Sequence, residues 1–120
     1  MTEILIKRAY TEPSDHDGYR ILVDRLWPRG LTKAALGLDQ WAKSLAPSSE
    51  LRKAWNHDTD QFEQFAAQYK DELNQNAAVD EFLELVDPMP TITLVYAARN
   101  EQANHAMVLR EYLLEQLKLR

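Results

Sequence analysis

The sequence predicts a single α/β domain over residues 1–120, in which a small, largely parallel central sheet is flanked by helices. Two observations carry this prediction. Three short apolar runs rich in branched residues indicate strands, and amphipathic segments with helical spacing lie between the second and third runs and after the third. A chain of 120 residues with 45% hydrophobic content has enough apolar material for one core.

The predicted strands cover residues 4–6, 19–24 and 91–98. The first two are joined by a segment of about ten residues that contains Pro13 and Gly18 and is short for a helical crossover, so their relative direction stays open. The run at 91–98 is apolar and branched nearly throughout, as expected for a strand covered on both faces. We therefore expect it to lie in the centre of the sheet.

Apolar spacing predicts the helices. Positions 38, 41, 42 and 45 follow a helical repeat, and Ser48 is a natural N-cap for a helix that continues to residue 55. Asp58 opens a stronger helix whose apolar stripe runs from Phe62 to Leu73, and shorter and longer helices follow at 77–86 and 100–118.

Composition excludes several classes of site. The chain has no cysteine, only three glycines and three histidines without i, i+4 spacing, so thiol chemistry, phosphate-binding glycine motifs and a dedicated metal site are not expected. No cofactor is predicted. The acidic start of the chain does not resemble a signal peptide, and no apolar run approaches the roughly 18 residues of a membrane span. We expect a cytoplasmic protein without membrane contact.

Charge is distributed unevenly along the chain. The net charge is -5, but residues 1–56 contain nine Lys and Arg against seven Asp and Glu, whereas the remainder is strongly acidic. A negative net charge repels nucleic acid, so a polyanion could bind only at a local basic patch. The candidate patch is Arg20, Arg25, Arg29 and Lys33.

Two loops are placed for ligand binding, because ligands of open α/β sheets gather beyond the carboxyl ends of the strands. One runs from Asp24 to Gly30 and the other from Tyr96 to His105. Arginine side chains offer forked donors for phosphate or carboxylate, and glycine allows a ligand to approach the backbone. The structural alternative is that Asp24 only holds a turn and that the second loop only caps a helix.

Each candidate residue has an expected role. Arg25, Arg29 and Arg52 would bind an anion, and Gly30 would admit it. Asp24 would orient an arginine or accept a ligand hydroxyl, while Tyr96 and Asn104 would orient the ligand. The candidate catalytic residues are His57 and Asp24, and the general acid or base would be His57, or less favourably His105. His105 is also a candidate ligand-binding residue. For His57 the alternative is a polar residue at a helix entry, next to the cap Asp58.

Several strings together resemble a known family. They are YRILVDRLWPRG at 19–30, LAPS at 45–48, LRK at 51–53, HD at 57–58, LVYAA at 94–98 and NHA at 104–106. This combination resembles the domain-of-unknown-function family 488, in its short YeaO-like branch, over about Ile4 to Leu117.

The resemblance implies one site built from both loops, since longer relatives have Asp-Val-Arg near Asp24-Arg25 and Cys-His-Arg near Asn104-His105. This chain lacks the cysteine, so thiol chemistry does not carry over. It also has Asn100 where an aspartate is expected, which removes a carboxylate there. The resemblance implies no reaction.

The sequence therefore predicts a protein that binds an anionic small molecule bearing phosphate or carboxylate at the carboxyl ends of the strands. Hydrolase or transferase activity and pure binding both stay open. The alternatives are a nucleic-acid-associated or regulatory protein, which the net charge disfavours, and a protein–protein adaptor that uses the acidic second half.

Overall fold

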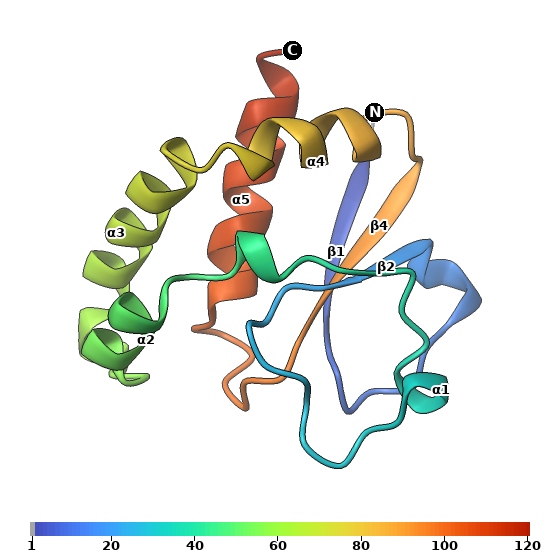
Figure 1. Ribbon diagram of the computed structural model, residues 1–120, viewed down its shortest axis with the longest axis horizontal. Helices are drawn as coiled ribbons and strands as arrows, with labels where there is room; N and C mark the ends of the chain where they lie inside the picture. The colour runs from blue at the N-terminus through green and yellow to red at the C-terminus, as the bar shows by residue number, and fades with distance from the viewer. Residues whose placement is uncertain (1) are drawn as a thin grey trace.

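The computed structural model describes residues 2–120 and contains a four-stranded sheet with helices on both faces (Figure 1). In chain order the elements are β1 (Glu3–Arg8), η1 (Asp15–Asp17), β2 (Tyr19–Leu22), α1 (Lys33–Leu36), β3 (Gln40–Trp41), η2 (Lys43–Leu45), α2 (Ser49–Trp55), η3 (Thr59–Gln61), α3 (Phe62–Asn74), α4 (Ala78–Val86), β4 (Thr91–Tyr96) and α5 (His105–Lys118). The predicted α/β class is confirmed.

The sheet has the strand order β1-β4-β2-β3, and every neighbouring pair is parallel. β4 pairs with β1 from Glu3↔Thr91 to Arg8↔Tyr96 and with β2 on its other side. The prediction that the run at 91–98 is central is confirmed, because β4 is an interior strand. Parallel strands place all their carboxyl ends at one edge, where the loops that follow β2 and β4 meet.

The open question about the first two strands is settled by their shared neighbour. β1 and β2 each run parallel to β4, so they are parallel to one another with β4 between them. Residues 9–18 cross back without an α-helix, with the short turn η1 near the end of the connection. Gly18 closes it at a φ of 64°, a conformation that favours glycine.

Each face of the sheet has its own apolar core. Alternate residues of β4 show the division, since Ile92 and Leu94 pack with the larger cluster whereas Val95 packs with the smaller one. Helices α2 to α5 supply the larger cluster, and Figure 1 shows them gathered on one side of the sheet. The smaller cluster is covered by α1 and the irregular segment around it, including partly buried Trp27 and Trp41.

The predicted apolar stripes and one predicted cap are confirmed. In α3 the buried residues are Phe65, Tyr69 and Leu73, at successive i, i+4 positions on one face. Ser48 caps α2, because its Oγ accepts a hydrogen bond of 3.1 Å from Leu51 N. The cap also joins two helices, since Ser48 N donates to Glu72 Oε1 in α3 at 2.9 Å.

Two predicted helices are wrong in part. Residues 38–45 form no α-helix: Gln40–Trp41 is the edge strand β3, and Lys43–Leu45 is a 3₁₀ turn. The last helix begins at His105 rather than at Asn100. Asn100 Oδ1 accepts from the backbone N–H groups of Gln102 and Ala103, and such local side-chain bonds compete with helix formation.

Arg20 does not belong to a basic surface patch, contrary to the sequence prediction. Only 4% of this residue is exposed, and its guanidinium donates to Asp17 Oδ2 at 2.7 Å and to Leu36 O at 2.7 Å. A buried charge is tolerated when it is paired and hydrogen-bonded, which is the case here. The four-residue patch therefore loses a member, and with it part of the case for nucleic acid.

No helix among residues 2–120 combines the length and the apolar character needed to cross a membrane.

Candidate functional site

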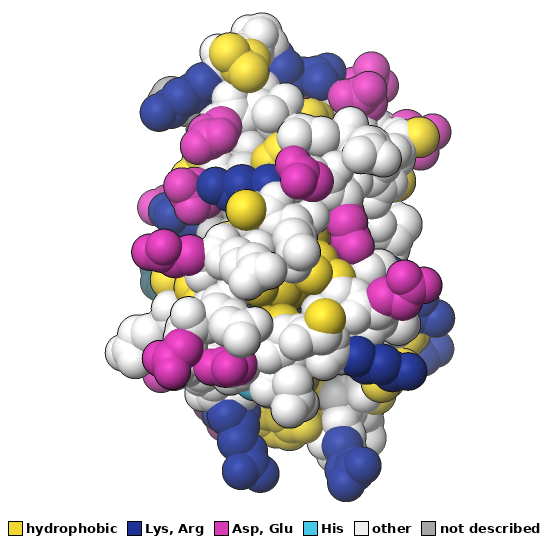
Figure 2. Space-filling view, turned by 90° about the vertical axis from the view of Figure 1, so that its left-hand side faces the viewer, with side chains coloured by type: hydrophobic (Ala, Val, Ile, Leu, Met, Phe, Trp, Pro, Cys, Tyr) yellow, Lys and Arg dark blue, Asp and Glu magenta, His cyan; other side chains and the backbone are white. Residues whose placement is uncertain are grey.

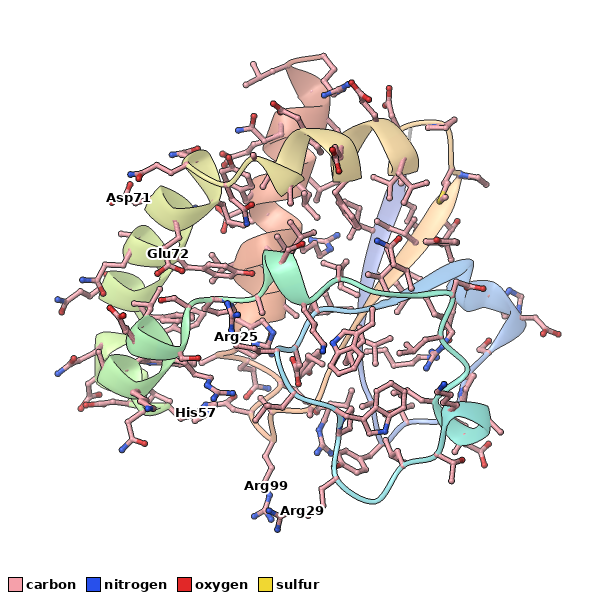
Figure 3. All side chains as sticks on the ribbon, viewed as in Figure 1. Arg25, Arg29, His57, Asp71, Glu72 and Arg99 are labelled. Atoms are coloured by element: carbon pink, nitrogen blue, oxygen red, sulfur yellow. The ribbon has the colours of Figure 1, made fainter. Side chains whose placement is uncertain are left out.

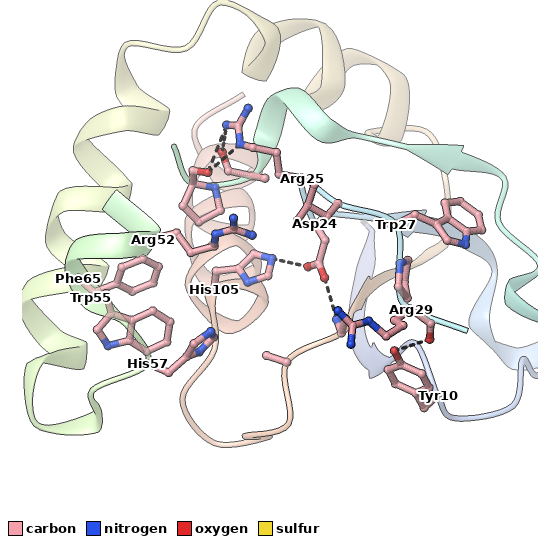
Figure 4. Close-up of a pocket in the computed structure, with 16 residues that line it drawn as sticks. Tyr10, Asp24, Arg25, Trp27, Arg29, Arg52, Trp55, His57, Phe65 and His105 are labelled. Carbon is pink, nitrogen blue, oxygen red and sulfur yellow. Dashed lines mark hydrogen bonds and ion pairs between the residues drawn. The ribbon is translucent and has the colours of Figure 1, made fainter. Parts of the chain in front are cut away.

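A cavity of about 320 Å³ opens at the carboxyl edge of the sheet (Figure 4). Most of it is formed by the loop after β2, the stretch from η2 to just beyond α2, and the loop between β4 and α5, and Tyr10 after β1 and Phe65 of α3 complete it. Its lining residues are Tyr10, Asp24, Arg25, Leu26, Trp27, Pro28, Arg29, Ala46, Pro47, Arg52, Trp55, His57, Phe65, Ala97, Ala98 and His105. The volume is at the lower end of the range of small-molecule sites.

Asp24 is fixed in the wall of this cavity by backbone and side-chain contacts. Its Oδ2 accepts a hydrogen bond of 3.0 Å from Ala97 N, which ties the β2 loop to the β4 loop. Its carbonyl accepts 2.7 Å from Trp41 Nε1. The remaining oxygen, Oδ1, lies 2.9 Å from Nε2 of His105. The carboxylate therefore has one defined orientation.

His105 is the first residue of α5, directly after its N-cap Asn104. Its Nε2 lies between two acceptors, Asp24 Oδ1 at 2.9 Å and Val23 O at 3.1 Å. The side chain is 13% exposed, and that of Asp24 is 16% exposed. The pair lies at the wall of the cavity with limited contact to solvent.

Arg25 braces the cavity from within its wall. Its Nε and Nη2 donate to Pro47 O at 3.3 and 3.2 Å, and Nη2 also reaches Ala46 O at 3.4 Å. These bonds attach the β2 loop to the segment that leads into α2. Part of the donor capacity of Arg25 is thus used by the protein itself.

Arg29 and His57 are exposed residues of the lining, whereas Arg52 is half-buried. Arg29 is exposed and is anchored through its backbone, since its carbonyl accepts 2.9 Å from the hydroxyl of Tyr10. Arg52 is half-buried on α2. Figure 3 shows Arg29 extending beyond the loops at the carboxyl edge, at the same end of the molecule as Arg99.

His57 follows α2 in an unusual backbone conformation. Both Asn56 and His57 have positive φ, 48° and 57°, and neither is glycine. Asn56 is the C-cap of α2. The imidazole of His57 then lies over Trp55, with 4.9 Å between ring centroids. The side chain of His57 lines the cavity.

The predicted residues Gly30, Tyr96 and Asn104 lie outside the cavity lining. Asn104 is fully buried, and its side chain accepts from Met107 N and donates to Asn100 O, so it shapes the start of α5. Tyr96 is 2% exposed, and burial, with the negative charge of Glu101, raises the pKa of its hydroxyl. Gly30 has a φ of 82° and open space around it.

Aromatic residues form one wall that the loop motifs did not indicate. Trp55 and Phe65 stack with 4.1 Å between ring centroids and an angle of 17°, and both line the cavity. Both rings also belong to the larger apolar cluster. Their second role depends on how α2 and α3 pack, so the sequence carries no signal for it.

The lining is cationic although the chain is acidic. It contains three arginines, two histidines and the single carboxylate Asp24, whereas the net charge of the chain is -5. Figure 2 shows acidic side chains spread along the α3 side of the molecule and basic side chains projecting from its lower end. Figure 3 places Arg29 and Arg99 at that same end.

The described residues 2–120 contain no cluster of three His, Asp or Glu side chains placed to hold a metal ion.

The fold and the cavity define a class: small parallel α/β proteins with a cationic, aromatic-walled cavity at the carboxyl edge. Within that class the chain belongs to the domain-of-unknown-function family 488. Residues 3–120 match the model DUF488-N3i, described as the inactive DUF488-N3 subclade.

Curated relatives cover nearly the whole chain. The uncharacterised protein YeaO of Escherichia coli strain K12 is 44% identical over 110 residues, which is 92% of this chain and 96% of that protein. An uncharacterised protein of Mycobacterium tuberculosis strain H37Rv is 38% identical over 112 residues, which is 93% of this chain and 94% of that protein. No solved structure matches the chain significantly.

Proposed function

We propose that this protein binds an anionic small molecule, bearing a phosphate or carboxylate, in the cavity at the carboxyl edge of the sheet. The observation that carries the proposal is the charge of the lining, where three arginines face a single carboxylate in a protein of net charge -5. Arginine is suited to this task because its forked N–H groups match phosphate and carboxylate oxygens.

The apolar wall adds a second preference. Trp55 and Phe65 present stacked rings to the cavity, and Pro28 and Pro47 line it as well. Ligand sites typically combine an apolar lining with a few polar groups that fix orientation. We therefore infer that the ligand carries a ring or another apolar part besides its anionic group.

The comparisons favour binding over turnover. The matching subclade is described as inactive, and the relatives reported above are uncharacterised. Hydrolase or transferase activity would need a general acid or base, for which His57, His105 and Asp24 are the candidates in the lining. We propose a binding protein, and the experiment below also measures turnover.

Arg52→Gln should weaken anion binding by about tenfold or more, since a hydrogen bond to a charged group contributes roughly 1.5–3 kcal/mol. The measurement is titration of the ¹⁵N-labelled protein with phenyl phosphate and with phenylacetate, followed by NMR shifts. Among the described residues no side-chain bond of Arg52 to the protein is found, so the variant should keep the fold.

Lys53→Gln is the matched control. Lys53 is the next residue on α2, is exposed, and lies outside the cavity lining, so the same charge is removed a few ångströms away. Its binding should equal that of the wild type. Absence of binding by the wild type, or an equal loss in both variants, would contradict the proposal. Phenol released from phenyl phosphate would contradict binding without turnover.

A further inference from the structure

The tautomer of His105 is determined by its surroundings. Nε2 lies 2.9 Å from Asp24 Oδ1 and 3.1 Å from Val23 O, and both of these atoms can only accept a hydrogen bond. A lone pair on Nε2 would face two oxygen atoms. In the neutral ring the proton therefore resides on Nε2, and Nδ1 carries the lone pair.

The carboxylate of Asp24 is held beside His105 by other contacts. Its second carboxylate oxygen is held by Ala97 N at 3.0 Å, and its carbonyl is held by Trp41 Nε1 at 2.7 Å. Among residues 2–120, Asp24 Oδ1 is a buried oxygen without a hydrogen bond of good geometry, and Nε2 of His105 lies 2.9 Å from it. The carboxylate therefore stays beside the imidazole, whose Nε2 is hydrogen-bonded to Val23 O.

Nδ1 is left as an acceptor beside the cavity. His105 lines the cavity, and within the described chain no donor reaches Nδ1. Figure 4 shows the ring between Asp24 and the aromatic wall, with one nitrogen directed to Asp24. Nδ1 is not among the buried atoms that lack a partner, so it contacts solvent in the free protein, and a hydroxyl of a ligand would replace that contact.

Arginines and Nδ1 select different parts of a ligand. Arg25, Arg29 and Arg52 only donate hydrogen bonds, so they recognise the anionic group. The lone pair of Nδ1 accepts only, so it recognises a hydroxyl. The lining therefore offers complementary contacts to a molecule that carries both groups.

We propose, on the basis of the anion-binding function above, that the ligand is a hydroxylated anion whose hydroxyl donates a hydrogen bond to Nδ1 of His105. Hydroxy acids and sugar phosphates share this chemistry. An otherwise identical anion without the hydroxyl leaves Nδ1 unpaired and binds more weakly.

The first test compares mandelate with phenylacetate, which share a phenyl ring and a carboxylate and differ by one hydroxyl. Mandelate, as one of its two enantiomers, should bind the wild type about threefold to tenfold more tightly, the range for one neutral hydrogen bond. His105→Gln should bring the ratio of the two dissociation constants to about one. His16→Gln, a change at an exposed histidine outside the lining, should preserve the ratio.

The second test reads the tautomer in the wild type without any ligand. Long-range ¹H–¹⁵N NMR at about pH 8, where an ordinary imidazole is neutral, should show the His105 proton on Nε2.

The outcomes separate the two proposals. If neither phenylacetate nor mandelate binds, the anion-binding function fails and this inference fails with it. If both bind with equal affinity, or if the wild-type proton is found on Nδ1, only the hydroxyl inference is overturned.

Discussion

Asp17→Asn should destabilise the protein by about 3–5 kcal/mol, the usual cost of removing one partner from a buried ion pair. Asp17 is 3% exposed and accepts hydrogen bonds from Lys7 Nζ at 2.8 Å, Arg20 Nη1 at 2.7 Å and Ser14 N at 2.9 Å. An amide at this position would direct its N–H₂ group at one of these donors. Urea unfolding at neutral pH measures the loss.

The loss should also depend on pH. Burial raises the pKa of Asp17, but the hydrogen bonds from Lys7, Ser14 N and Arg20 outweigh burial and hold the pKa below its ordinary value of 3.8. A carboxyl whose pKa is lower in the folded state stabilises that state above its unfolded pKa, and the stabilisation disappears as the pH falls through the folded pKa. The gap between wild type and Asp17→Asn should therefore shrink at acid pH, below the ordinary value.

Asp15→Asn is the control for both measurements. Asp15 belongs to the same turn, η1, but it is exposed, and its carboxylate is not among the hydrogen-bond partners of the Arg20 guanidinium. Its effect should stay within about 0.5 kcal/mol, as for surface substitutions in general. A loss in Asp17→Asn no larger than that of the control would show that the buried pair contributes no stability.

Gly18→Ala should be nearly as damaging, by about 2–5 kcal/mol from backbone strain and overpacking together. An added Cβ would lie 2.2 Å from the backbone oxygen of Thr91, and the φ of Gly18 is 64°. Because the obstacle is the backbone at the start of the central strand β4, no side-chain rotation relieves it. Thermal or urea unfolding gives the free energy of unfolding.

Gly30→Ala separates the two causes of that loss. Gly30 has a φ of 82° but nothing within 4 Å of an added Cβ, so only the conformational cost of roughly 1–2 kcal/mol applies. Equal losses in the two variants would rule out the clash with Thr91.

The elements that the sequence predicted well are those whose signals are local. The branched run of β4 and the apolar stripe of α3 are contained in their own residues, as is the Ser48 cap of α2. β3 was missed because it has only two residues, and its Trp41 also fits a helical repeat. Its pairing with β2 is a contact between distant segments, which no periodicity contains.

In the candidate site, too, local features were predicted from the sequence and contacts between distant segments were not. The sequence indicated the Asp24 and His105 loops, because loops after neighbouring parallel strands meet at one edge. It could not indicate that Nε and Nη2 of Arg25 donate to the carbonyl oxygens of Pro47 and Ala46, or that Arg20 is buried. These facts depend on which acceptors the folded chain brings within hydrogen-bond distance.

The sequence by itself determined the α/β class and the order of the main elements, and it predicted an anion site at the loop that opens at Asp24. Only the tertiary structure decided which charged groups line the cavity and that Nε2 of His105 lies between Asp24 Oδ1 and Val23 O. The physical reason is that residue type fixes the donors and acceptors of a side chain, whereas packing between distant segments decides which of them are already used.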